Sequence, residues 1–170
     1  MKETIALFLL IIVMPFGILL AQDDEPCPCC TSEHRQFDFW LGSWVVFDTL
    51  GNEVGINNIV LLQDSCLIQE NWTGSGGGTG TSYNYYNSTD HSWNQLWIDN
   101  SGSVLEMKGR YEKGMMILES QYQKGMNMLM FKNRISWEEM PDGSIVQTWD
   151  ALNECGKLQR RLFKGIYRKQ

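Results

Sequence analysis

Polar side chains stand two residues from a tryptophan in three segments of this sequence. The pairs are Glu70 with Trp72, Gln95 with Trp97, and Gln147 with Trp149. In a β-strand, residues two apart lie on the same face, so each pair would present one polar group beside an indole ring. An apolar cavity with a few convergent polar groups is the usual anatomy of a small-molecule site. We therefore predict that these six residues, with Tyr85 as a further stacking surface, bind a small hydrophobic or aromatic molecule.

A second arrangement is open on the same pattern. The polar groups could hydrogen-bond to one another inside a filled core, as buried polar groups normally do. The protein would then be a structural or interaction module that binds no ligand.

Glu70 is the carboxylate of this set, and it shares its expected strand face with Ile68 and Trp72. If Glu70 lies inside without a cation, burial should raise its pKa, and a carboxyl group of this kind can act as a general acid or base. The sequence has no nucleophile elbow, no paired histidines and no metal-ligand spacing. We therefore expect a binding protein with no cofactor and no metal, and keep Glu70 as the catalytic residue of the alternative, an enzyme on the same scaffold.

Short segments with strand-like composition, separated by Gly, Asn, Asp and Pro, fill the chain after residue 43. These segments are Trp44–Leu50, Val54–Leu62, Cys66–Thr73, Thr81–Asn87, Trp93–Asp99, Val104–Gly109, Met115–Tyr122, Met128–Trp137, Ser144–Leu152 and Lys157–Arg168. Regular spacing of this kind is typical of a sandwich or barrel. Tight turns between consecutive segments predict an up-and-down meander, and closing the meander removes both exposed edges. We therefore predict an all-β, antiparallel barrel of about ten strands, wide enough to hold a small ligand, after a short helical turn within residues 33–41.

The N-terminus has the layout of a secretory signal. Residues 4–21 carry no charge, follow Lys2 and end in Leu19-Leu20-Ala21, with a small residue at the expected cut. Pro15 and Gly17 interrupt the apolar run, which argues against a membrane span that persists after processing. The sequence thus predicts a signal peptide (1–21), a flexible, cysteine-rich tail (22–33) and one barrel domain (34–170), in a protein that is secreted or periplasmic.

Five cysteines are present, three of them crowded at positions 27, 29 and 30. An exported chain meets oxidising conditions, which favours disulfides over a soft-metal site in the tail. An odd count leaves at least one sulfur free or paired between chains. Cys66 could pair with Cys155 or with Cys30, and the sequence does not choose between them.

The formal net charge is −6, which makes nucleic acid an unfavourable partner. The last fourteen residues nevertheless hold six basic residues and no acidic one. This asymmetry predicts a basic final strand beside acidic neighbours.

The segment Arg35–Trp44, RQFDFWLGSW, resembles the start of lipocalins and of the wider calycin group, in which a short helical turn leads into the first strand. Together with CLIQENW, GTSYNYY, WNQLWID and GIYRK, it is similar to an exported bacterial family of lipocalin-like proteins of unknown function. The resemblance covers residues 34–169. It implies structural roles for Trp40, Gly42 and Trp44, with Trp44 packed across the closed end of the barrel against Arg168 or Lys169.

The resemblance implies a fold but hardly an activity. Nitrobindin, a ten-stranded haem-binding barrel, holds its haem by a histidine on a strand near the C-terminus. This chain has no histidine after His91, so we expect no haem site of that design.

Overall fold

The computed structural model describes residues 27–125 and 129–170. The predicted signal peptide lies outside these ranges, as does the start of the predicted tail. Over the described ranges, no helix is long and apolar enough to cross a membrane.

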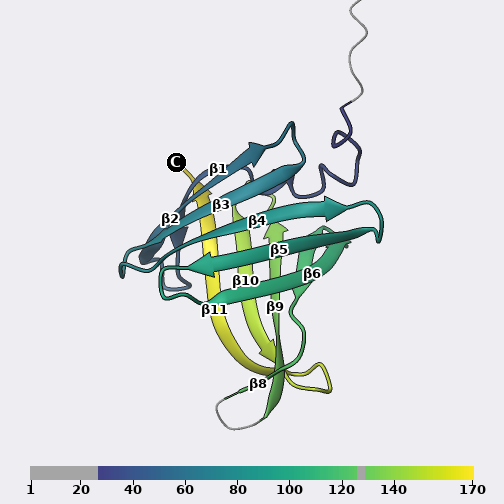
Figure 1. Ribbon diagram of the computed structural model, residues 1–170. Coiled ribbons are helices and arrows are strands. Elements are labelled where there is room, and N and C mark those ends of the chain that lie inside the picture. Colours follow the sequence, from purple (N-terminus) through teal and green to yellow (C-terminus); the bar gives the residue numbers. More distant parts are fainter. Residues whose placement is uncertain (1–26, 126–128) are drawn as a thin grey trace, which may run out of the picture.

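Eleven β-strands and one short 3-10 turn make up the regular structure of the described residues (Figure 1). In chain order they are η1 (Asp38–Trp40), β1 (Gly42–Phe47), β2 (Glu53–Leu62), β3 (Leu67–Gly74), β4 (Thr79–Asn87), β5 (Ser92–Asp99), β6 (Val104–Glu112), β7 (Met115–Glu119), β8 (Gln123–Lys124), β9 (Met130–Glu139), β10 (Ile145–Leu152) and β11 (Leu158–Lys169).

Ten of these strands form a closed antiparallel barrel. Neighbours follow the order β10-β11-β1-β2-β3-β4-β5-β6-β7-β9, and β9 pairs with β10 to close the ring. Figure 1 shows β1–β6 crossing in front of β9–β11 at a steep angle, as expected when a twisted sheet closes on itself. The predicted all-β, up-and-down barrel is therefore confirmed.

The one departure from the predicted meander lies between β7 and β9. The strand predicted to reach Tyr122 ends at Glu119, the last residue that pairs with both β6 and β9. Gln123 and Lys124 then form the two-residue strand β8, which pairs with β9 alone. This short hairpin projects beyond the barrel, at the bottom of Figure 1. Met128, where the sequence predicted that the next strand begins, lies outside the described residues.

Aromatic side chains fill one end of the barrel, which we call the closed end and define by Phe37, Trp40, Trp44 and Trp93. Phe37 stacks on Trp40 with 4.8 Å between ring centroids and meets Trp93 edge-on at 5.7 Å. The Trp44 Nε1–H donates to the Trp40 carbonyl oxygen at 2.8 Å, which ties β1 to η1. All four side chains are almost fully buried, so this end of the barrel is closed by the chain itself.

Gly42 and the last strand fix the position of Trp44. Gly42 has a φ of +124°, a conformation that glycine adopts without steric cost, and it turns the chain from η1 into β1. Lys169, not Arg168, is the basic residue over Trp44, with Nζ 5.4 Å from the ring centroid. Trp44 pairs with Lys169 across β1 and β11, so alternation directs the neighbouring Arg168 to the outer face. There Arg168 lies 5.5 Å from the ring of Phe47.

Two disulfides hold the N-terminal segment. Cys29 is bonded to Cys66 in the turn between β2 and β3, and Cys27 is bonded to Cys30. Neither pairing considered from the sequence is present. Cys30 is bonded to its neighbour Cys27, and Cys155 lies in the β10–β11 turn, at the opposite end of the barrel from Cys66. All five cysteines are among the described residues, and Cys155 keeps an exposed free thiol.

Candidate functional site: an internal cavity

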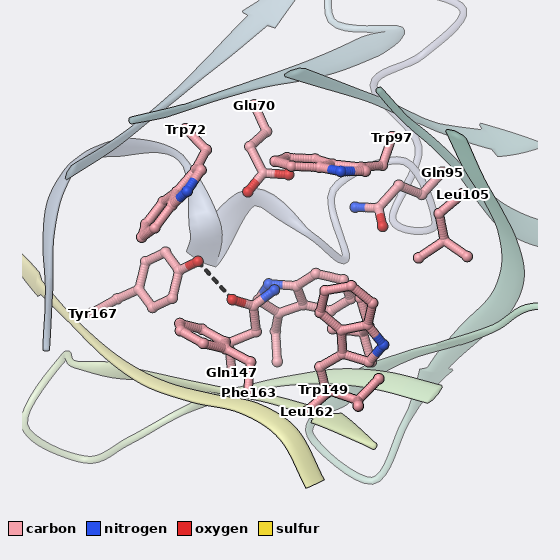
Figure 2. A pocket seen from close by; sticks show the side chains of 12 residues that line it. Glu70, Trp72, Gln95, Trp97, Leu105, Gln147, Trp149, Leu162, Phe163 and Tyr167 are labelled. Atoms are coloured by element: carbon pink, nitrogen blue, oxygen red, sulfur yellow. Dashed lines mark hydrogen bonds between the residues drawn. The ribbon is translucent and has the colours of Figure 1, made fainter. Parts of the chain in front are cut away.

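A cavity of about 260 Å³ lies inside the barrel, away from the closed end. It occupies the end at which the β3–β4, β5–β6 and β10–β11 hairpins lie, and we call this the cavity end. Twelve residues line the cavity (Figure 2): Glu70, Trp72, Gln95, Trp97, Leu105, Ile135, Trp137, Gln147, Trp149, Leu162, Phe163 and Tyr167.

The structure brings together six of the seven residues that the sequence proposed for a ligand site. Strand alternation turns the three polar–tryptophan pairs inward from β3, β5 and β10, and all six side chains line the cavity. Tyr85 does not join them. It is 43% exposed, because its neighbours Asn84 and Tyr86 take the inward face of β4.

The cavity wall depends on a close approach of an indole ring to the backbone. A Cβ atom at Gly80 would lie 2.1 Å from a ring carbon of Trp97. Only glycine leaves room for the ring at this position, because real Cβ atoms do not approach other atoms so closely. Gly80 on β4 therefore allows the Trp97 ring, from β5, to lie against the sheet and bound the cavity.

The sequence did not identify six of the residues that line the cavity: Leu105, Ile135, Trp137, Leu162, Phe163 and Tyr167. Phe163 and Tyr167 alternate inward from β11, two residues on either side of Gly165, so the same rule of alternation could have found them. Trp72 meets Phe163 edge-on with 6.4 Å between ring centroids, so the two walls of the cavity touch there.

Glu70 lies at the centre of a buried network of polar side chains. It is 5% exposed, accepts a hydrogen bond on Oε1 from Asn57 Nδ2 at 2.7 Å, and accepts another on Oε2 from the Ser82 hydroxyl at 2.6 Å. Behind Ser82, Gln95 Nε2 donates to Asn84 Oδ1 at 2.8 Å, and Asn84 Nδ2 donates to Ser82 Oγ at 2.9 Å. The chain of donors therefore runs from Gln95 toward the Glu70 carboxylate.

A second branch of the network reaches the opposite wall through Tyr167. Asn57 Nδ2 approaches the Tyr167 oxygen at 3.3 Å, and the Tyr167 hydroxyl donates to Gln147 Oε1 at 2.7 Å. This last bond is drawn in Figure 2. The polar residues predicted on β3, β5 and β10 are thus linked through Asn57, Ser82, Asn84 and Tyr167, which the sequence did not identify.

Burial sets the ionisation of this site. It raises the pKa of Glu70, and the hydrogen bonds from Ser82 and Asn57 offset only part of the effect. Burial, with the nearby Glu70 carboxylate, also raises the pKa of Tyr167 well above its ordinary value. Tyr167 therefore stays neutral, and Glu70 holds its proton to a higher pH than an exposed glutamate does.

Two amide atoms at the cavity have no partner among the described residues. Gln95 uses its Nε2 for Asn84 and Ser82, which leaves Oε1 as an acceptor. Gln147 uses Oε1 for Tyr167, which leaves Nε2 as a donor. A molecule in the cavity could therefore be oriented by hydrogen bonds as well as by contact with the rings.

Metal chemistry has no evident ligand set here. Within residues 27–125 and 129–170, no three His, Cys, Asp or Glu side chains are grouped to hold a metal ion. The cavity offers one carboxylate and otherwise amides, a phenol and aromatic rings. This donor set suits recognition of an organic molecule.

Fold and site together define a class: a closed, ten-stranded, lipocalin-like antiparallel barrel with a small, mostly apolar internal cavity. No protein-family model matches the chain, and no curated protein is significantly similar to it. Membership of the exported lipocalin-like family, which the opening motif resembles, is therefore a proposal.

Proposed function

We propose that this protein binds a small hydrophobic or aromatic molecule inside the cavity end of its barrel. The observation that carries the proposal is the cavity itself, bounded by Trp72, Trp97 and Trp149 and bordered by the Glu70 network. Apolar walls with a few placed polar groups are the usual composition of a ligand site. The polar groups do form hydrogen bonds to one another, as expected for a filled core without a ligand site. A cavity nevertheless remains beside them.

The volume limits the size of the ligand. About 260 Å³ lies below the range of about 300–1,000 Å³ typical of sites for drug-sized molecules. A cavity of about 150 Å³ is sufficient for benzene. A molecule with one or two rings therefore matches this volume better than a haem or a long-chain lipid does.

The test uses three probes that share a phenyl ring: 2-phenylethanol, 2-phenylethylamine and phenylacetate. The seven tryptophans give separate indole N–H signals in a two-dimensional NMR spectrum. At least one probe should shift the signals of the cavity tryptophans 72, 97 and 149 and leave those of Trp40 and Trp44 unchanged. The proposal is wrong if no probe shifts a cavity signal, or if the closed-end signals shift equally.

A matched pair of variants locates the binding. Leu105 lines the cavity, whereas its neighbour Val104 is 60% exposed on the outer face. Leu105→Trp should place an indole ring in the cavity and weaken probe binding about tenfold or more, because the ring occupies the volume that the probe needs. Val104→Trp adds the same ring outside and should leave the affinity unchanged.

We also propose that the protein is exported and works in an oxidising compartment. Support comes from the disulfides Cys27–Cys30 and Cys29–Cys66 and from the apolar run at 4–21. Cell fractionation and mass spectrometry of the mature N-terminus test this proposal. A cytoplasmic protein that retains residue 1 would contradict it.

A further inference from the structure

We propose that the molecule held in the cavity is a protonated amine on a small apolar or aromatic body, with its ammonium group against Glu70 and its body against the tryptophans. The inference rests on the proposed function, because it names the ligand class of the same site. It is carried by the charge balance of the cavity, the direction of its hydrogen bonds and the composition of its walls.

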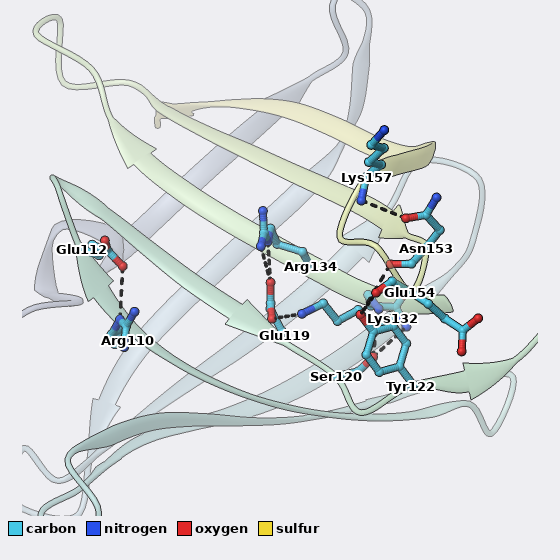
Figure 3. A network of polar contacts seen from close by, with 11 residues as sticks. Arg110, Glu112, Glu119, Ser120, Tyr122, Lys132, Arg134, Asn153, Glu154 and Lys157 are labelled. Carbon is cyan, nitrogen blue, oxygen red and sulfur yellow. Dashed lines mark hydrogen bonds and ion pairs between the residues drawn. The ribbon is translucent and has the colours of Figure 1, made fainter. Parts of the chain in front are cut away.

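Glu119 and Glu70 differ in whether a cation lies beside the carboxylate. Glu119, on the outside of β7, is bonded to Lys132 and to Arg134, whose Nε lies 2.6 Å from Oε1 (Figure 3). Burial raises the pKa of Glu119, but its hydrogen bonds to these two cations outweigh that effect and hold the pKa below its ordinary value. Glu70 is more deeply buried, and among the described residues it has no cation and accepts hydrogen bonds only from uncharged groups.

A carboxylate removed from water without a cation is costly. None of the twelve residues that line the cavity is basic. A cationic ligand would supply the missing charge, whereas an anionic ligand would place two like charges side by side. The charge balance therefore favours an amine over a carboxylic acid or a phosphate.

The hydrogen bonds around Glu70 present its carboxylate as an acceptor. Every bond that reaches Glu70 is donated to it, from Asn57 on one oxygen and from Ser82 on the other. A carboxylate has about four acceptor positions, so capacity is left on the side that faces the cavity, and Figure 2 shows the carboxylate of Glu70 pointing between Trp72 and Trp97. Gln95 Oε1 adds a second acceptor. An ammonium group, with three donors and no acceptor, matches this surface.

The aromatic rings of the cavity wall also suit a ligand with an ammonium group. Cations bind over the faces of tryptophan rings more strongly than over other aromatic side chains, and cages of such rings hold ammonium groups. Trp72 and Trp97 stand on either side of Glu70 in Figure 2, with Trp149 and Phe163 opposite. The same rings supply the apolar surface on which the body of the ligand would pack.

The test compares the affinities of the three phenyl probes for the full-length mature protein at about pH 8, by calorimetry or NMR. A hydrogen bond to a charged group in a desolvated site contributes more than one between neutral groups, so 2-phenylethylamine should bind at least about tenfold more tightly than 2-phenylethanol. Phenylacetate should bind most weakly. If 2-phenylethanol binds in the cavity and the amine binds no better, the inference is wrong and the proposed function stands. If none of the three binds, both fail.

Glu70→Gln tests the role of the carboxylate, with Glu119→Gln as its matched control. Glu70→Gln should bring the affinities for the amine and the alcohol to within about twofold of each other, mainly by weakening the amine. Glu119→Gln should leave the preference for the amine intact, since Glu119 faces outward. A Glu70→Gln protein that is folded and still prefers the amine overturns the inference.

The pH dependence of the wild-type protein provides a test that requires no variant. As the pH falls through the raised pKa of Glu70, the carboxylate is protonated and amine affinity should fall, while alcohol affinity stays constant. The groups that face Glu70 are Asn57 from β2, Ser82 from β4, Gln95 from β5, Gln147 from β10 and Tyr167 from β11. Tyr167 is the titratable one, and its raised pKa keeps it neutral over this range. Amine affinity that stays constant as the pH is lowered to 4.5, the ordinary value for a glutamate, contradicts the inference.

Discussion

The closed end and the cavity end of this barrel are both built from tryptophan, yet they differ in what fills the space between the rings. At the closed end, the segment before β1 inserts Phe37 and Trp40 among the rings, and their side chains are 0% exposed. At the cavity end no segment of the described chain enters, and about 260 Å³ stays open between Trp72, Trp97 and Trp149. In this barrel a tryptophan is therefore packed in the core or borders the cavity according to whether the chain supplies its neighbour.

The largest expected effect tests the packing of the closed end. Trp40→Ala removes a ring that stacks on Phe37 and should lower the free energy of unfolding by about 3–5 kcal/mol, the usual cost of truncating a large buried ring. Trp97→Ala should cost clearly less, because Trp97 already borders an open volume and loses fewer contacts. Denaturant unfolding measures both, and equal losses would remove the distinction between the two ends.

The second prediction concerns the covalent attachment of the segment that fills the closed end. Replacing Cys29 and Cys66 with serine should lower the free energy of unfolding by about 2–4 kcal/mol, because this disulfide closes a loop with a sequence separation of 37. The same double change at Cys27 and Cys30 should cost less, since that bond spans a separation of only 3. Both are measured by thermal or denaturant unfolding without reductant. A larger loss at the short disulfide would show that it, and not Cys29–Cys66, holds the segment.

The third prediction concerns the cavity end, where Glu70 should make the stability of the protein depend on pH. Because burial raises the pKa of Glu70 in the folded state, the unfolded chain ionises first as the pH rises above 4.5, the ordinary value. The free energy of unfolding of the wild-type protein should fall by about 1.4 kcal/mol for each pH unit between 4.5 and the raised pKa. Glu70→Gln does not titrate, so its stability relative to wild type should increase over that window and then level off. Urea unfolding across pH measures the difference, and a difference independent of pH would show that burial does not disfavour the Glu70 charge.

The smallest expected effect on stability is that of a change at Glu119, on the outer face of the barrel. Glu119→Gln removes ion pairs with Lys132 and Arg134 that are partly exposed, so the loss of stability should be below about 1 kcal/mol and should shrink with added salt. The contribution of Glu119 to stability changes with pH in the opposite direction to that of Glu70. The pKa of Glu119 is lowered, so its contribution is present above 4.5 and is lost as the pH falls through the lowered value. Denaturant unfolding at low and high salt measures this loss of stability. A loss as large as that of Trp40→Ala would show that the exposed ion pairs matter as much as the packing of the closed end.

Alternation predicted six of the twelve residues of the cavity wall, and it did so without a folded structure. Once the strands were located by their turn residues, the inward faces of β3, β5 and β10 followed from a period of two. The aromatic ring of Tyr85 predicts a stacking surface, but the inward face of β4 belongs to Ser82, Asn84 and Tyr86. The same rule separates Lys169 from Arg168 at Trp44, but only after the register between β1 and β11 is known.

Partners across the barrel lay beyond the reach of the sequence. Asn57 and Tyr167 are separated by 110 residues, yet they approach within hydrogen-bond distance beside Glu70. The disulfide partner of Cys66 likewise depends on where the N-terminal segment returns to the barrel. Such contacts follow from closure and strand register, which no local pattern encodes.

By itself, the sequence determined the strand pattern, the all-β class and the inward placement of Glu70, Gln95 and Gln147 beside tryptophans, because these depend on local turn chemistry and on alternation. Tertiary structure decided which tryptophans are packed and which bound a cavity, and it left Glu70 buried with no cation beside it among the described residues. Those outcomes depend on how ten strands close and on which segment enters each end. The space beside Glu70 is therefore a property of the assembled barrel, and it is where we expect the ligand.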